Sequence, residues 1–150
     1  MSQTQHEFYV TTPHGRPDFR LVQAFLWGDD KDTDSDGNAI NPASRKWTEL
    51  ILELRGAAGE RFDVVEHKWS PLTLKVMSEN KYLAARVAYL LAHCTRGQVA
   101  RTSSGPYENS ETLIPEMGQD FDLEEALTRF HDSPFRQSTL ENPDLGLASE

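Results

Sequence analysis

The strongest constraint on the fold is a short strand pattern followed directly by a long amphipathic helix pattern. Residues 72–77 (LTLKVM) alternate apolar and polar side chains, which predicts a half-buried strand. Residues 78–96 then carry an apolar stripe at helical spacing, formed by Leu83, Val87, Leu90, Leu91 and Cys94. We expect Ser78 to cap this helix and Gly97 to end it. A helix in this position would cover one face of a sheet.

Other segments supply further strands. Residues 7–11 (EFYVT) and 20–27 (RLVQAFLW) are β-branched and aromatic runs between turn residues, so we predict a strand for each. Residues 46–55 fit both a helical stripe and strand alternation. We favour a strand, because Gly56 to Gly59 can turn the chain into the alternating run 61–67.

The remaining elements are shorter. The segment between Asp29 and Ala43 is predicted to be a long loop, and residues 98–101 a short strand. A short helix is expected at 110–114, weakened by Pro115.

The C-terminal third is predicted to be helical and acidic from about residue 106. Asp122 is expected to cap a helix whose apolar face is Leu123, Ala126, Leu127 and Phe130. Residues 133–150 show little apolar periodicity, which predicts a flexible or surface-draped tail. The sequence therefore predicts a single α+β domain over residues 1–132, with a mostly antiparallel sheet and one main helix packed on it.

Composition and the absence of targeting patterns indicate the cellular compartment in which the chain is expected to fold. A chain of 150 residues can bury a core without disulfide or metal support. The single cysteine, Cys94, cannot form an internal disulfide, which favours a reducing compartment. Residues 1–6 do not match a secretory signal, and no apolar run approaches the ~18 residues that span a bilayer. We therefore expect a cytoplasmic protein with no membrane partner.

The charge is unevenly distributed. The formal net charge is −9, while residues 1–101 contain 13 acidic and 13 basic side chains. Residues 102–150 contain 11 acidic side chains against Arg129 and Arg136. The whole acidic excess thus lies in the last third, which argues against nucleic-acid binding and suggests either an acidic docking face or a solvated tail.

One segment resembles a cation-binding motif. Asp32, Asp34, Asp36 and Gly37 match the first half of a calcium-binding EF-hand loop. The second half fails, because Ala43 stands where a bidentate Glu is required. We predict a solvated loop, with calcium binding as the alternative.

No complete catalytic motif is present in the sequence. There is no nucleophile elbow, no glycine-rich phosphate loop and no pair of His residues at helical metal-binding spacing. His93 and Cys94 are neighbours on the predicted helix, so their side chains point about 100° apart. We therefore predict a protein that is not an enzyme and needs no cofactor, with an enzyme of dispersed His and carboxylate residues as an alternative.

Four runs resemble small bacterial immunity proteins of polymorphic and type VI secreted toxin systems. They are DG…NP…SRKWTEL (36–50), SPLTLKV (70–76), AARVAYLLA (84–92) and TRGQV (95–99). The resemblance covers residues 36–101 at most. It implies a small, acidic, cytoplasmic, non-enzymatic protein that inhibits one toxin by occluding its active site.

The charge pattern suggests which residues such a protein would use. A toxin with a basic active-site cleft would attract an acidic inhibitor. The predicted contact residues are Asp29, Asp30, Asp32, Asp34, Asp36, Glu116, Asp120, Asp122, Glu124 and Glu125. Another acidic binding or regulatory protein, such as a phage-encoded inhibitor or a structural subunit, remains the competing hypothesis.

Overall fold

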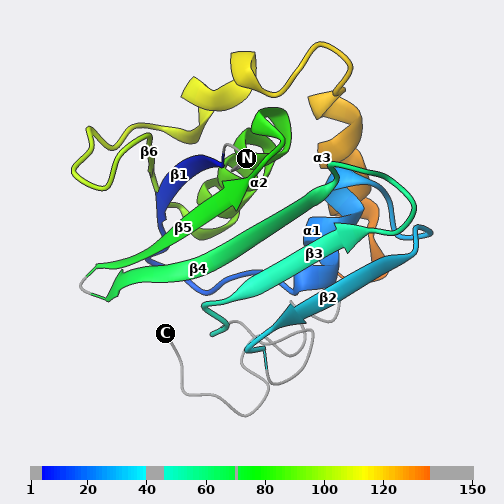
Figure 1. Ribbon diagram of the computed structural model, residues 1–150, viewed down its shortest axis with the longest axis horizontal. Helices are drawn as coiled ribbons and strands as arrows, with labels where there is room; N and C mark the ends of the chain where they lie inside the picture. Colours follow the sequence, from blue (N-terminus) through cyan, green and yellow to red (C-terminus); the bar gives the residue numbers. More distant parts are fainter. Residues whose placement is uncertain (1–4, 40–45, 70, 136–150) are drawn as a thin grey trace, which may run out of the picture.

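The protein folds as an antiparallel sheet with helices packed on one face (Figure 1). The computed structural model describes residues 5–39, 46–69 and 71–135. The sheet has six strands in the order β2-β3-β4-β5-β1-β6, and every neighbouring pair is antiparallel. This confirms the predicted α+β fold.

The elements follow one another along the chain. The strands are β1 (His6–Thr11), β2 (Thr33–Gly37), β3 (Leu50–Leu54), β4 (Arg61–Trp69), β5 (Leu72–Ser78) and β6 (Val99–Ala100). The helices are α1 (Phe19–Leu26), α2 (Lys81–Thr95), the 3-10 helix η1 (Ser110–Glu116) and α3 (Leu123–Asp132). The strands predicted at 7–11, 46–55, 61–67, 72–77 and 98–101 are therefore confirmed, with shifted ends.

The core lies between the sheet and helices α1 and α2. Alternating residues of the central strands point into it, including Phe62 and Val64 of β4 and Leu74 and Val76 of β5, all fully buried. The helices contribute buried side chains that include Leu21, Val22, Phe25, Leu83, Val87, Leu90 and Leu91. No helix of residues 5–39, 46–69 and 71–135 lies against the opposite face of the sheet, as is common in antiparallel sheets (Figure 1).

The strand predicted at 20–27 is wrong, because this segment forms helix α1. The Asp18 carboxylate caps it by accepting a hydrogen bond from the Arg20 backbone N–H at 2.8 Å. Leu21, Val22 and Phe25 recur at helical spacing and are buried. The amphipathic helical pattern therefore prevails over the strand preference of these β-branched and aromatic residues.

The segment predicted as a loop over 29–43 contains the edge strand β2. Thr33 to Gly37 pair antiparallel with Leu54 to Leu50 of β3. Strand composition is poor here, since four of the five residues are Asp, Ser or Gly. Pairing with a regular neighbouring strand is what makes it extended. Residues 40–43 of the predicted loop lie outside the described residues.

Helix α2 begins and ends one or two residues away from the predicted positions. Asn80, not Ser78, is the N-cap, and its side chain accepts hydrogen bonds from the N–H groups of Tyr82 and Leu83. Arg96, not Gly97, adopts the left-handed conformation that ends the helix, with φ of 58°. Gly97 is needed for another reason, because a Cβ there would overlap the carbonyl oxygen of Thr11.

The C-terminal elements follow the prediction in part. The short helix is a 3-10 helix that includes Pro115, and Asp122 caps α3 as expected. The tail was predicted to begin at residue 133, yet Ser133 is buried and the Phe135 ring lies 4.1 Å from the Arg20 guanidinium. Residues 136–150 of the predicted tail lie outside the described residues.

Candidate partner-binding surface

The ten carboxylates predicted to bind a partner lie at three places. Nine of these residues are exposed, and Glu116 is half-buried. One group lies in or next in sequence to the lining of a groove between α1 and α3, one lies on or directly before the edge strand β2, and Glu116 lines a separate pocket.

The groove brings together residues from distant parts of the chain. It has a volume of about 400 Å³ and is lined by Trp27 and Lys31 after α1, Leu54 of β3, and Phe121 before α3, among others. Three of the predicted carboxylates, Asp120, Asp122 and Glu125, line it as well. Asp29 and Asp30 lie in the same segment as Trp27 and Lys31, so they belong to the same end of the molecule. Figure 1 shows that β3 ends and β2 begins at this end, beside α3.

Some of these carboxylates maintain the local structure. Asp122 Oδ1 accepts the Glu125 backbone N–H at 3.0 Å and so caps α3. Glu125 Oε1 accepts a hydrogen bond from Arg129 Nη1 at 2.9 Å. Asp29 Oδ1 accepts one from the Ser133 hydroxyl at 3.1 Å, which fastens the end of α3 to the loop after α1.

The other carboxylates in this group remain available to bind a partner. Asp30, Asp120 and Glu124 are exposed, and within the described residues their side chains make no hydrogen bond or ion pair. We call these three the available carboxylates. They are the groups near this groove that a partner can bind without breaking a hydrogen bond or ion pair between the described residues.

The lining of the groove includes a half-buried arginine, Arg86. Burial lowers the pKa of the Arg86 guanidinium, against the opposing attraction of Glu60 and Asp120. Arg86 Nε donates to the Met117 carbonyl at 2.9 Å, and its guanidinium lies 4.5 Å from the centre of the Phe121 ring. The groove lining therefore combines the carboxylates Asp120, Asp122 and Glu125 with the cations Lys31, Arg86 and Arg129. Arg86 is held by a carbonyl and an aromatic ring.

The β2 carboxylates lie on the edge of the sheet. Arg55 Nε donates to Asp34 Oδ1 at 2.9 Å, and Arg55 Nη1 donates to Asp32 Oδ2 at 3.4 Å. The hydrogen bond from Arg55 lowers the pKa of the Asp34 carboxyl. The register places Asp36 of β2 opposite Ile51 of β3, and Ile51 opposite Asp63 of β4. These three residues share the sheet face that is turned away from the helices.

This arrangement does not resemble a calcium loop. An EF-hand loop folds its oxygen ligands around one point, whereas β2 is extended and Arg55 contacts two of the three aspartates. Over the described residues, no group of three or more His, Cys, Asp or Glu side chains is placed to hold a metal ion.

Glu116 is separated from the other predicted residues. It accepts a hydrogen bond from Arg101 Nη1 at 2.8 Å, in a pocket between β1, α2 and η1. Asp120, the next predicted contact residue along the chain, lines the groove instead.

His93 and Cys94, which are neighbours on α2, lie in different environments. The His93 ring is exposed and stacks on the Tyr89 ring at 5.6 Å, while Cys94 is partly buried against the core.

Among the helices that the structure describes, none has the length and apolar character needed to cross a membrane.

The contacts that shape the groove were not predicted from the sequence. Trp27 Nε1 donates to Glu60 Oε1 at 3.0 Å, and Asn80 Nδ2 donates to Glu60 Oε2 at 2.9 Å. These contacts join residues 33 and 20 positions apart, and no local pattern indicates them.

No protein-family model, curated protein or solved structure matches this chain.

Proposed function

We propose that this chain is an immunity protein that neutralises a secreted bacterial toxin by docking its acidic end against a basic active-site cleft. The observation that carries the proposal is the gathering of carboxylates around one groove. Asp120, Asp122 and Glu125 line the groove together with Trp27 and Lys31, which are about ninety positions away in the sequence. Asp29 and Asp30 lie between Trp27 and Lys31 in the sequence, and Asp29 contacts Ser133 after α3. The resemblance of residues 36–101 to immunity proteins supplies the class of partner.

The groove combines the two properties that such a contact requires. The available carboxylates Asp30, Asp120 and Glu124 give a negative potential that would accelerate encounter with a basic surface. Trp27 and Phe121 also line the groove. The Phe121 ring already lies against the Arg86 guanidinium, so Trp27 is the aromatic side chain that an Arg or Lys of the partner would meet. Carboxylates that already cap or brace α3 keep this surface rigid, which reduces the entropy lost on binding.

The direct test is inhibition of a toxin encoded beside this gene. Co-expression with the neighbouring toxin should restore growth for the wild-type chain. A triple variant, Asp30→Asn, Asp120→Asn and Glu124→Gln, should protect markedly less. A matched variant, Glu66→Gln, Glu108→Gln and Glu111→Gln, removes three exposed carboxylates elsewhere and should protect like the wild type.

The same experiment separates the competing hypotheses. If the purified chain binds the neighbouring protein but leaves its activity intact, the chain is an acidic binding module of another kind. If the two triple variants protect equally well, the contact surface lies elsewhere on the molecule and the proposal is wrong.

A further inference from the structure

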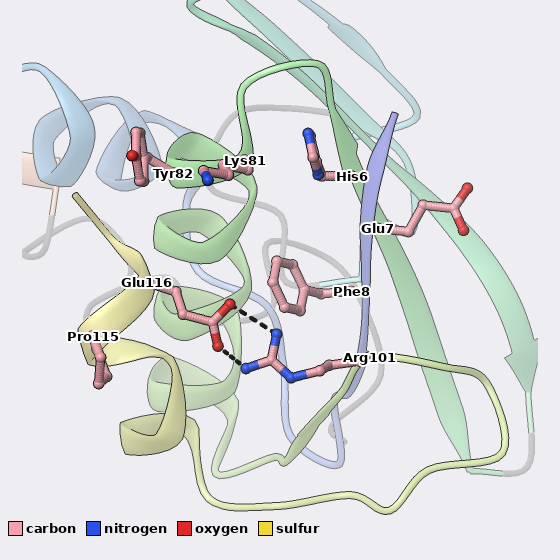
Figure 2. A pocket seen from close by; sticks show the side chains of 8 residues that line it. All are labelled: His6, Glu7, Phe8, Lys81, Tyr82, Arg101, Pro115 and Glu116. Atoms are coloured by element: carbon pink, nitrogen blue, oxygen red, sulfur yellow. Dashed lines mark hydrogen bonds and ion pairs between the residues drawn. The ribbon is translucent and has the colours of Figure 1, made fainter. Parts of the chain in front are cut away.

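A second pocket, distinct from the groove between α1 and α3, lies between β1, the start of α2 and the end of η1. It has a volume of about 340 Å³. Its lining includes His6 and Phe8 from β1, Lys81 and Tyr82 from α2, Arg101 after β6, and Glu116 from η1. Figure 2 shows His6 and Lys81 toward one end of this pocket, the Arg101–Glu116 pair toward the other, and the Phe8 ring between them.

The charges in this pocket are unbalanced in favour of cations. Glu116 is paired with Arg101, so these two charges compensate each other. Glu7 also borders the pocket, but its carboxylate points away in Figure 2 and pairs with Lys75 at 3.2 Å. Lys81 is exposed and, within the described residues, has no carboxylate partner. A cationic pocket is unexpected in a protein whose net charge is −9.

An anion in this pocket would be bound by side chains. The N–H groups of Tyr82 and Leu83 already donate to Asn80 Oδ1, at 3.1 and 3.2 Å. The positive end of the α2 dipole reinforces the charge of Lys81, which is the first residue of that helix. The ammonium of Lys81 and the ring of His6 are therefore the donors that would meet a carboxylate.

The rest of the lining is apolar or already satisfied. Tyr82 is 43 % exposed, and its ring centre lies 5.3 Å from the Lys81 ammonium. Phe8 borders the pocket but is 6 % exposed and belongs to the core. The Arg101 guanidinium lies 5.6 Å from the centre of the Phe8 ring and is held by Glu116. An apolar cavity of about 150 Å³ is enough to hold benzene, so this pocket has room for one aromatic ring and a charged substituent.

We propose that this pocket binds a small aromatic carboxylate. The carboxylate would lie beside Lys81 and His6, and the ring would lie against Phe8 and Tyr82. The proposal does not depend on the toxin-binding role, because the pocket shares no residue with the groove at the α1 and α3 end.

The test uses the full-length ¹⁵N-labelled protein and three probes. Phenylacetate carries both the ring and the charge, phenylacetamide carries only the ring, and inorganic phosphate carries only charge. We expect phenylacetate to shift the backbone amide signals of Phe8, Lys81, Tyr82 and Arg101 in a saturable manner. Phenylacetamide and phosphate should shift them much less at equal concentration and ionic strength. Equal shifts from phenylacetamide, equal shifts from phosphate, or shifts scattered over the surface would overturn the proposal.

Two lysine variants test whether Lys81 is the residue that contacts the carboxylate of phenylacetate. Lys81→Gln removes the charge in the pocket, and we expect phenylacetate binding to weaken about two- to fivefold, the range for one exposed charge contact. Lys68→Gln removes an exposed lysine at the far end of β4 and should leave the affinity unchanged. Equal affinities for the wild type and Lys81→Gln would contradict the assignment. The triple variant of the available carboxylates should retain wild-type affinity for phenylacetate, which separates this site from the proposed toxin contact.

Discussion

Arg129 Nη2 of α3 donates a hydrogen bond to the backbone carbonyl of Phe25 in the last turn of α1 at 2.7 Å. Arg129 Nε donates to the Ala24 carbonyl at 2.9 Å. The last four carbonyls of a helix have no partner within the helix, so one side chain from 104 residues away serves two of them. This contact holds the acidic first turn of α3 at the same end of the molecule as Asp29 and Asp30.

Replacing this arginine should destabilise the fold. Arg129→Met keeps most of the aliphatic stem but loses the hydrogen bonds to Ala24 and Phe25, and we expect the free energy of unfolding to fall by about 1.5–3 kcal/mol. Urea denaturation followed by circular dichroism measures this. Arg55→Met, which removes an exposed arginine, should have a clearly smaller effect, and equal effects of the two would mean that Arg129 does not brace α1.

Glu60 is expected to be a second structural anchor of the groove. Its two carboxylate oxygens accept hydrogen bonds from Trp27 and Asn80, so Glu60→Ala should lower the free energy of unfolding by about 1–3 kcal/mol. The environment of Trp27 should change with it, and the tryptophan fluorescence spectrum of the folded protein reports that change. Glu66→Ala, an exposed glutamate on β4, serves as the control. A loss of stability no larger than that of the control would refute this role.

Gly97 is predicted to tolerate no side chain. Gly97→Ala places a Cβ against the Thr11 carbonyl, which separates α2 from β1 and should destabilise by more than about 2 kcal/mol. Gly59→Ala meets no atom within 4 Å but has φ of 81°, so only backbone strain of about 1 kcal/mol is expected. Thermal unfolding of both variants gives the comparison. A melting temperature for Gly97→Ala at or above that of Gly59→Ala would show that the close approach is relieved at little cost.

Asp34 should titrate below an ordinary aspartate. Its folded-state pKa is lowered, so the contribution of the Asp34–Arg55 pair is present above the unfolded pKa of about 3.9 and is lost as the pH falls through the folded value. Carbonyl ¹³C NMR titration measures the shift directly. In Arg55→Gln the Asp34 pKa should return toward 3.9. An unchanged Asp34 pKa in that variant would assign the shift to another cause.

The sequence predicts the centre of the fold better than its periphery. Residues 72–96 were predicted well because alternation in β5 and helical spacing in α2 both arise from burial on one side. Residues 19–26 were assigned to the wrong class because Val22 and Phe25 favour strands locally, while the cap at Asp18 and the helical stripe determine the outcome. Edge strand β2 has almost no strand signal of its own, so its conformation depends on β3.

The candidate surface was predicted only as a list of exposed carboxylates. Charged side chains are expected to be exposed, and nine of the ten predicted carboxylates are exposed, Glu116 being half-buried. The grouping around one groove depends on Arg129, Glu60 and the packing of α3 on α1, which are tertiary contacts. Such contacts leave no periodic pattern in a single sequence.

The central claim is that the available carboxylates steer a basic partner to the α1 and α3 end. Its most direct test is the association rate of the proposed toxin partner, measured at low and high salt. At 50 mM salt the triple variant of Asp30, Asp120 and Glu124 should associate roughly three- to tenfold more slowly than the wild type, and this difference should nearly vanish at about 500 mM. The matched variant of Glu66, Glu108 and Glu111 should associate at close to the wild-type rate. Equal slowing by both variants, or none by either at low salt, would contradict the account.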